Sequence, residues 1–103
     1  LAGLDLVTPY EAPGCEHVYH LYAIRSPRRD AIAAKLQDAG IGFATHYRNP
    51  PHLQPALGGY SVAQADLPVT MRCADEILEL PMYPELTTGQ VDRVCEVVRS
   101  ALE

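Results

Sequence analysis

The 103-residue sequence predicts an α+β domain of two layers, with a small, mainly antiparallel sheet packed by about three helices. The first observation behind this prediction is that apolar residues recur at helical spacing in three segments. The second is that the stretches between them are rich in β-branched and aromatic residues. The third is that glycine, proline and capping residues separate the segments, in the order strand, helix, strand, loop, helix, short strand, helix.

The first strand is predicted over residues 17–25, where apolar and aromatic side chains occupy both alternating faces. A strand of this kind is usually covered on both sides. We expect one cover to be the domain's own helices and the other to be part of a larger protein. Residues 1–14 are accordingly predicted to be the tail of an interdomain helix followed by a linker, and residues 15–103 to be the domain.

The first helix is expected over residues 27–39, with Ser26 as its capping residue. Gly40 is expected to end this helix because glycine adopts the left-handed conformation without steric cost. Ile41 can then pack back on Leu36, which is the arrangement of a Schellman motif.

The chain is then predicted to run extended over residues 41–47, until Pro50 and Pro51 exclude both a helix and a central paired strand. A second helix is expected over residues 66–78, with Asp66 as its cap. Its inward stripe is expected to consist of Val69, Cys73 and Ile77.

A short extended segment through Leu80 is expected before the last helix, whose start carries the clearest local signals. Thr87 and Gln90 have the spacing of a capping box, and Leu86 and Val91 have that of a hydrophobic staple. The buried stripe of this helix is expected to consist of Val91, Val94, Cys95, Val98 and Leu102.

The composition bounds the class of protein and its partners. The sequence holds 13 acidic and 8 basic residues, for a net charge of −5, whereas nucleic-acid binding favours an excess of positive charge. No apolar run is long enough to span a bilayer, and the first residues lack the charged region of a signal peptide. We therefore expect a cytoplasmic protein that binds neither nucleic acid nor membrane.

The three cysteines, Cys15, Cys73 and Cys95, form no Cys-x-x-Cys pair. Cys73 and Cys95 fall on the apolar stripes of their predicted helices and are expected to be small buried residues. Cys15 and His17 would share one face of a strand, while His20 would point to the opposite face. A structural zinc site needs four convergent ligands, so no metal site is expected here.

The segment over residues 40–54 joins a helix end, a strand and a loop that is stiffened by prolines. The end of the strand and the loop carry side chains suited to binding a ligand: His46, Tyr47, Arg48, Asn49 and His52. Residues at the end of a strand are presented at the edge of the sheet, where binding residues gather. From periodicity alone, Tyr47 could instead continue the apolar face of Phe43, and His46 could be a solvated residue.

These residues, with the Leu-Pro-Met-Tyr-Pro-Glu-Leu-Thr run over residues 80–87, resemble the C-terminal small domain of the DegT/DnrJ/EryC1/StrS aminotransferases. The likeness extends from about residue 17 to the end of the chain. It includes the strand over residues 17–25 and the spacing from the His46-Tyr47 pair to the His-Leu-Gln-Pro run over residues 52–55. One departure is Arg48, because many members of the family have proline directly after the His-Tyr pair.

The resemblance implies the small domain of a fold-type I aminotransferase that uses pyridoxal phosphate (PLP) and acts on a nucleotide-linked keto sugar. It implies glutamate or glutamine as amino donor, a homodimer, and a large N-terminal domain that precedes this chain and holds the Schiff-base lysine. The resemblance also implies that the loop after the His46-Tyr47 pair lies over the cofactor and the sugar. There Arg48 and Asn49 could reach the diphosphate, the sugar hydroxyls or the donor carboxylate. His52 is placed on the same loop.

The chain has a single lysine, Lys35, on the polar side of the first predicted helix. No glycine-rich phosphate cradle lies near it in the sequence, so Lys35 is expected to be a solvated helix residue. We therefore assign no catalytic residue to this chain and expect it to be inactive alone. The alternative is a free-standing α+β module that binds a ligand or a partner without catalysis, which would explain the chain length and the missing lysine without a larger protein.

Overall fold

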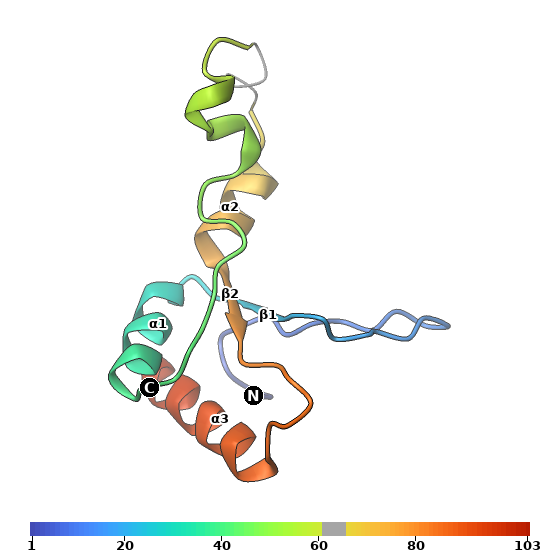
Figure 1. The fold of residues 1–103 in the computed structure, drawn as a ribbon, viewed down its shortest axis with the longest axis vertical. Coiled ribbons are helices and arrows are strands. Elements are labelled where there is room, and N and C mark those ends of the chain that lie inside the picture. Colours follow the sequence, from blue (N-terminus) through green and yellow to red (C-terminus); the bar gives the residue numbers. More distant parts are fainter. Residues whose placement is uncertain (61–65) are drawn as a thin grey trace.

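The computed structural model describes residues 1–60 and 66–103. In these residues two strands pair in a sheet, and helices follow each strand (Figure 1). The elements in chain order are β1 (Tyr22–Arg25), α1 (Arg29–Asp38), the 3-10 turns η1 (Pro51–Leu53) and η2 (Pro55–Leu57), α2 (Pro68–Glu76), β2 (Ile77–Leu80) and α3 (Thr88–Leu102). The α+β class and the antiparallel pairing are confirmed.

The sheet consists of β1 and β2, with one further bridge on each outer edge. Val7 bridges Arg25 of β1, and Ala44 bridges Glu79 of β2, both in antiparallel fashion. The segments that come before β1 and after α1 therefore flank the two strands. Only Ala44 of the predicted extended segment is paired in this way, so the expected strand over residues 41–47 is reduced to a single bridge.

The core lies between one face of this sheet and the helices α1 and α3, which pack against each other (Figure 1). Ile24 of β1 is paired with Leu78 of β2, and both side chains are fully buried. The core cluster consists of Ile24, Ile32, Leu36, Leu78, Leu80, Val94, Val97, Val98 and Ala101. Burying each large aliphatic side chain contributes about 1.5–3 kcal/mol, so this cluster holds the two layers together.

The end of α1 is the predicted Schellman motif. Gly40 has φ +68°, the Ile41 N–H donates to the Leu36 carbonyl at 2.9 Å, and the Gly40 N–H donates to the Gln37 carbonyl at 3.0 Å. Ile41 also packs against the core cluster, as expected from the sequence. These bonds satisfy carbonyl groups that the end of a helix leaves without partners.

The start of α3 is the predicted capping box. The Gln90 N–H donates to Thr87 Oγ1 at 3.3 Å, and the Thr87 N–H donates to Gln90 Oε1 at 2.9 Å. The predicted stripe is correct at Val94 and Val98, but Val91 is 41% exposed. Val97 and Ala101 are buried in addition, because α3 faces α1 as well as the sheet.

The predicted first strand is too long, since β1 begins at Tyr22 and not at residue 17. Residues 10–21, which we call the arm, are exposed throughout and project from the body (Figure 1). Their bonds are local: the His17 N–H donates to Glu11 Oε1 at 2.9 Å, and the Tyr19 N–H donates to His17 Nδ1 at 2.8 Å. Within the described chain no strand pairs with these residues, and His17 and His20 are both exposed.

Two helix starts differ from the prediction. Ser26 Oγ accepts a hydrogen bond from the Arg28 N–H at 3.1 Å and closes a turn, so α1 begins only at Arg29. The residue before α2 is Leu67, which provides no side-chain cap, so Asp66 does not have the expected role. In both places the residue before the helix, Arg28 or Leu67, has a non-helical backbone conformation.

The predicted inward stripe of α2 is also wrong. Val69 is 66% exposed, and Ala74 is the buried residue of this helix. Ile77 belongs to β2 and Cys73 is half-buried. The physical reason is that α2 stands apart from the layer formed by α1 and α3, where it has little to pack against (Figure 1).

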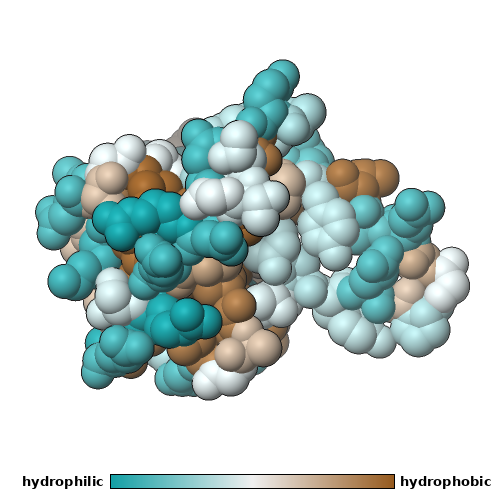
Figure 2. Space-filling view, turned by 90° about the horizontal axis from the view of Figure 1, so that it is seen from below, coloured by the Kyte–Doolittle hydropathy of each residue, from teal (hydrophilic) through white to brown (hydrophobic). Residues whose placement is uncertain are grey.

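The molecule is more extended than a compact domain of this length. Its radius of gyration is 15.7 Å, whereas about 13 Å is expected for a compact domain of this size. The arm stands apart from the body, and apolar surface shows between hydrophilic side chains on the underside of the body (Figure 2). Residues 1–7 do not form the expected helix tail, since Leu6 packs on the core and Val7 joins the sheet.

In the described parts of the chain, no helix is both long enough and apolar enough to cross a bilayer.

Candidate active-site cleft

The residues that suggested a binding loop face α2 across a cleft of about 310 Å³. The loop side of the cleft is formed by His46, Tyr47, Pro50 and Pro51. The opposite side is formed by Val69, Thr70, Cys73 and Ala74 of α2, with Ile77 of β2. The two residues of the His-Tyr pair thus lie at one cavity.

His46 is held against a buried carboxylate at this cleft. Its backbone N–H donates to Glu79 Oε2 and Oε1 at 3.2 and 3.3 Å. Its ring Nδ1 lies 3.4 Å from Glu79 Oε2. The Glu79 side chain is 4% exposed, while that of His46 is 43% exposed, so the imidazole remains open to a ligand.

The pairing of the backbone explains why these two side chains meet. The Ala44 N–H donates to the Glu79 carbonyl at 3.2 Å, and the Glu79 N–H donates to the Ala44 carbonyl at 2.9 Å. Paired residues of antiparallel strands share a face, and residues two apart along an extended chain share that face too. His46 therefore lies diagonally across from Glu79.

Tyr47 is presented to solvent, with 68% of its surface exposed. Its ring meets the His46 ring edge to face, with the centroids 5.3 Å apart and the planes at 88°. The peptide bond between the two residues is cis. Because its side chain is exposed, Tyr47 does not join the core cluster of the described residues.

Arg48 reaches back to the start of α1. Its Nη2 lies 2.9 Å from Asp30 Oδ1, and the two side chains are 65% and 75% exposed. The same oxygen lies 2.7 Å from Nε of the buried Arg29, although that N–H is not aimed at the oxygen as a hydrogen bond requires. An exposed pair of this kind contributes about 0–1 kcal/mol, so Arg48 can exchange Asp30 for an anionic ligand at little cost.

Arg48, Asn49 and His52 do not line the cleft. The Asn49 backbone carbonyl accepts a hydrogen bond from Gln54 Nε2 at 2.8 Å, which braces the loop, and its side chain is exposed. His52 is 6% exposed in η1. A role for His52 or Asn49 in contacting a substrate stays a prediction.

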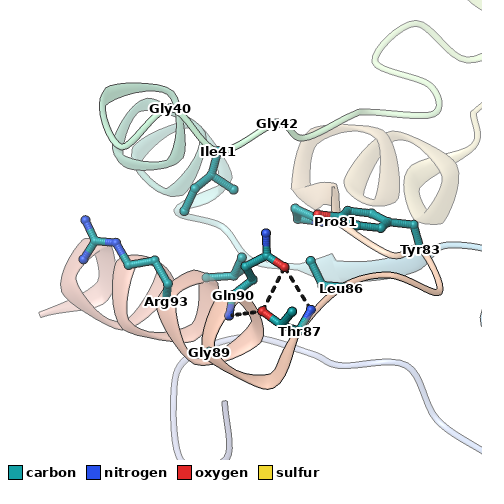
Figure 3. A pocket seen from close by; sticks show the side chains of 11 residues that line it. Gly40, Ile41, Gly42, Pro81, Tyr83, Leu86, Thr87, Gly89, Gln90 and Arg93 are labelled. Atoms are coloured by element: carbon teal, nitrogen blue, oxygen red, sulfur yellow. Dashed lines mark hydrogen bonds between the residues drawn. The ribbon is translucent and has the colours of Figure 1, made fainter.

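A larger groove of about 480 Å³ lies elsewhere, between the end of α1 and the start of α3 (Figure 3). Ile41 and Pro81 line it, and its polar groups include Thr87 and Gln90. The hydrogen bonds between these two residues form the capping box, and Arg93 extends away from Pro81 at the far end (Figure 3). None of the predicted site residues lines this groove, so the smaller cleft is the candidate site.

Sequence reasoning missed Thr70, Cys73 and Glu79 as neighbours of the site. For Glu79 a signal was present, because an acidic residue interrupts the apolar Ile-Leu-Glu-Leu sequence of β2. Charged residues are almost never fully buried without a partner, so this position indicates a paired carboxylate. For Thr70 and Cys73 no such signal exists, since their approach depends on where α2 lies.

The residues of this chain do not fit the covalent attachment of PLP. Lys35 is exposed on α1 and shares its surroundings with Asp38, Arg93 and Glu96, away from the cleft. A Schiff-base lysine needs an enclosed site that also holds the cofactor phosphate. Among the described residues, no group of three or more His, Cys, Asp or Glu side chains gathers to hold a metal ion.

The chain belongs to the DegT/DnrJ/EryC1/StrS aminotransferase family, whose family model matches residues 1–99. It is 43% identical over 101 residues to a dTDP-3-amino-3,4,6-trideoxy-alpha-D-glucose transaminase of Micromonospora megalomicea, covering 97% of this chain and 26% of that protein. It is 38% identical over 102 residues to a UDP-N-acetyl-3-dehydro-alpha-D-glucosamine 3-aminotransferase of Acidithiobacillus ferrooxidans, covering 99% and 27%. The chain thus spans about a quarter of the length of these relatives.

Solved structures agree with the fold. Streptomyces venezuelae DesV, determined in complex with a ketimine intermediate, is 38% identical with a TM-score of 0.91, covering 99% of this chain and 28% of that one. Bacillus subtilis NtdA, determined with the cofactor PMP bound, is 26% identical with a TM-score of 0.78, covering 95% and 23%. The arrangement described above is therefore that of one part of a larger aminotransferase fold.

Proposed function

We propose that this chain is the small domain of a PLP-dependent aminotransferase that acts on a nucleotide-linked keto sugar. Residues 15–103 form this domain in the proposal, and residues 1–14 lead into it from a large domain that holds PLP on its own lysine. The family membership and the names of the relatives support this proposal over a free-standing binding module. We further propose a cytoplasmic homodimer that uses glutamate or glutamine as amino donor.

The observation that carries the proposal is that His46 and Tyr47 lie together on the wall of a cleft, with both side chains accessible. An imidazole and a phenol can each exchange hydrogen bonds with the hydroxyl groups of a sugar. Arg48, exposed beside them, offers a guanidinium fork that suits a diphosphate or a carboxylate. The amino transfer itself is the chemistry of PLP, and this chain contributes positioning and the exclusion of water.

Replacing His46 tests this assignment in the intact gene product. We expect His46→Ala to lower kcat roughly five- to tenfold, because one substrate hydrogen bond of ~1–1.5 kcal/mol is lost. The fold should persist, since the His46 side chain is 43% exposed and does not belong to the core cluster. Steady-state kinetics with circular dichroism would measure both quantities.

The matched control is Asp38→Ala, an exposed polar residue on α1 that does not line the cleft. This variant should keep the turnover of the unmodified enzyme. Unchanged kinetics for His46→Ala, in a protein that folds normally, would remove the cleft from the active site.

A further inference from the structure

Glu79 is a buried carboxylate whose only side-chain partner in the described chain is His46. Its neighbours Leu78 and Leu80 point into the core, so Glu79 points to the opposite face of the sheet. Among the described residues, no lysine or arginine forms an ion pair with it. Because an unpaired buried charge is costly, the contact with His46 has to compensate the burial of this carboxylate.

The position of Glu79 in the sheet makes room for this contact. It is paired with Ala23 on β1 and bridged to Ala44 on the other side. Side chains of paired residues lie on one face, so two small alanines flank the carboxylate. The nearest polar side chain that the extended backbone can bring to this face is that of His46, two residues after Ala44.

The contact also constrains the histidine ring. The ring contact with Glu79 is electrostatic and is not aimed as a hydrogen bond, but a carboxylate oxygen presents only lone pairs, so a protonated nitrogen facing it is favoured over a nitrogen lone pair. The nitrogen that faces Glu79 is Nδ1, at 3.4 Å from Oε2. In the neutral ring, Nε2 is then an acceptor, and it is the nitrogen left for a ligand in the cleft.

We propose that Glu79 is a positioning residue that fixes the orientation and the tautomer of His46 at the sugar side of the active site. It does so with two contacts, one to the backbone N–H, which pins the start of the loop, and one to Nδ1, which directs Nε2 to the substrate. This inference rests on the proposed function, because it concerns the same cleft. Glu79 acts through His46 and does not touch the substrate.

If Glu79 only braced the loop, it would act through its contact with the His46 backbone N–H alone. The tautomer of the His46 ring would then not depend on the charge of residue 79. The test therefore compares Glu79→Gln with the unmodified intact gene product, both labelled with 15N-histidine. Ring nitrogen chemical shifts in NMR report which nitrogen of His46 carries the proton. Glutamine keeps the size of the side chain and an oxygen for the His46 N–H, so the fold is retained.

We expect Nδ1–H in the unmodified protein and a shift of the population toward Nε2–H in Glu79→Gln, because the amide group can donate to Nδ1. We also expect kcat to fall roughly tenfold with a smaller change in KM, because a ring in the other tautomer presents a donor where the substrate contact needs an acceptor, at a cost of about 1–1.5 kcal/mol. Glu76→Gln is the matched control. That neighbouring carboxylate contacts Arg25 at 3.4 Å instead, so neither quantity should change.

An unchanged tautomer of His46 in Glu79→Gln would overturn the inference. Should this variant unfold, Glu79→Asp retains the charge and withdraws the oxygens by one methylene group, and faster hydrogen exchange at the His46 amide is expected. Unchanged exchange there would equally overturn it. If the tautomer shifts while both Glu79→Gln and His46→Ala keep full turnover, the positioning role stands and the proposed function of the cleft fails.

Discussion

Three buried polar residues each connect the core to a segment outside it. Ser26 Oγ donates to the Asp5 carbonyl at 3.1 Å, which ties down the N-terminal segment. Arg29 Nη1 donates to the Ala74 carbonyl at 3.4 Å, near the end of α2. Glu79 accepts from the N–H of His46 and holds the loop. Because buried polar groups need partners, each of these side chains fixes where its segment leaves the core.

At the scale of single residues, Tyr22 makes the free energy of unfolding depend on pH. Burial, and then the neighbouring Tyr19 and Cys95, raise the pKa of Tyr22 above its ordinary value. The unfolded chain loses this proton near the usual tyrosine pKa of about 10, while the folded chain still holds it. Above that pH the unfolded state binds fewer protons, so the contribution of Tyr22 to stability is complete below pH ~10 and is lost as the pH rises further.

We therefore expect Tyr22→Phe to flatten the loss of stability as the pH rises above about 10. Urea unfolding of the 103-residue chain at a series of pH values would measure the free energy of unfolding. Tyr10→Phe is the control, because the Tyr10 side chain is 77% exposed on the arm. Equal pH dependence in Tyr22→Phe and the unmodified chain would contradict the prediction.

Element boundaries were predictable where the signal is local. The glycine that ends α1 and the capping box that starts α3 involve contacts between residues at most five apart. Such contacts form whatever the rest of the chain does, so their residue types can be recognised in the sequence. The start of β1 and the buried face of α2 depend on partners distant in the chain. There the sequence predicted a strand that is too long and a buried stripe that does not form.

The capping box gives a prediction at this scale. Thr87→Ala removes the acceptor of the Gln90 N–H, and the expected loss is about 1 kcal/mol of unfolding free energy. Urea unfolding followed by circular dichroism would measure this loss. Thr88→Ala is the matched control, since Thr88 is the first helical residue and takes no part in the box. A loss in Thr88→Ala as large as that in Thr87→Ala would argue against the capping role.

At the scale of the whole molecule, two segments project from a small body. The arm and the α2 region extend away from the core formed by β1, β2, α1 and α3 (Figure 1). Large apolar side chains are exposed on both, among them Val18 on the arm at 87% and Val69 on α2 at 66%. Exposed apolar surface of this kind is typical of regions that contact other protein surfaces. A neighbouring large domain, as proposed above, would cover it.

The proposal that the PLP-binding lysine lies in the large domain can be tested directly. The intact gene product would be incubated with PLP, reduced with borohydride and digested, and the modified peptide identified by mass spectrometry. We expect the stable adduct outside this chain, because Lys35 is exposed and lacks a phosphate cradle. Lys35→Ala should leave the yield of the adduct unchanged. A stoichiometric adduct on Lys35 would contradict the assignment of the lysine to the large domain.

The sequence by itself determined the family, the α+β class, the C-terminal end of α1, the start of α3, and the segment that carries the candidate site. These follow from residue types and short spacings, which act within a few residues. Only the tertiary structure decided that Glu79 meets His46, which is 33 residues away along the chain, and that His52 is buried. Such contacts depend on strand register and on the position of α2, and pairing across a long separation is set by the packing of the whole core rather than by local preference.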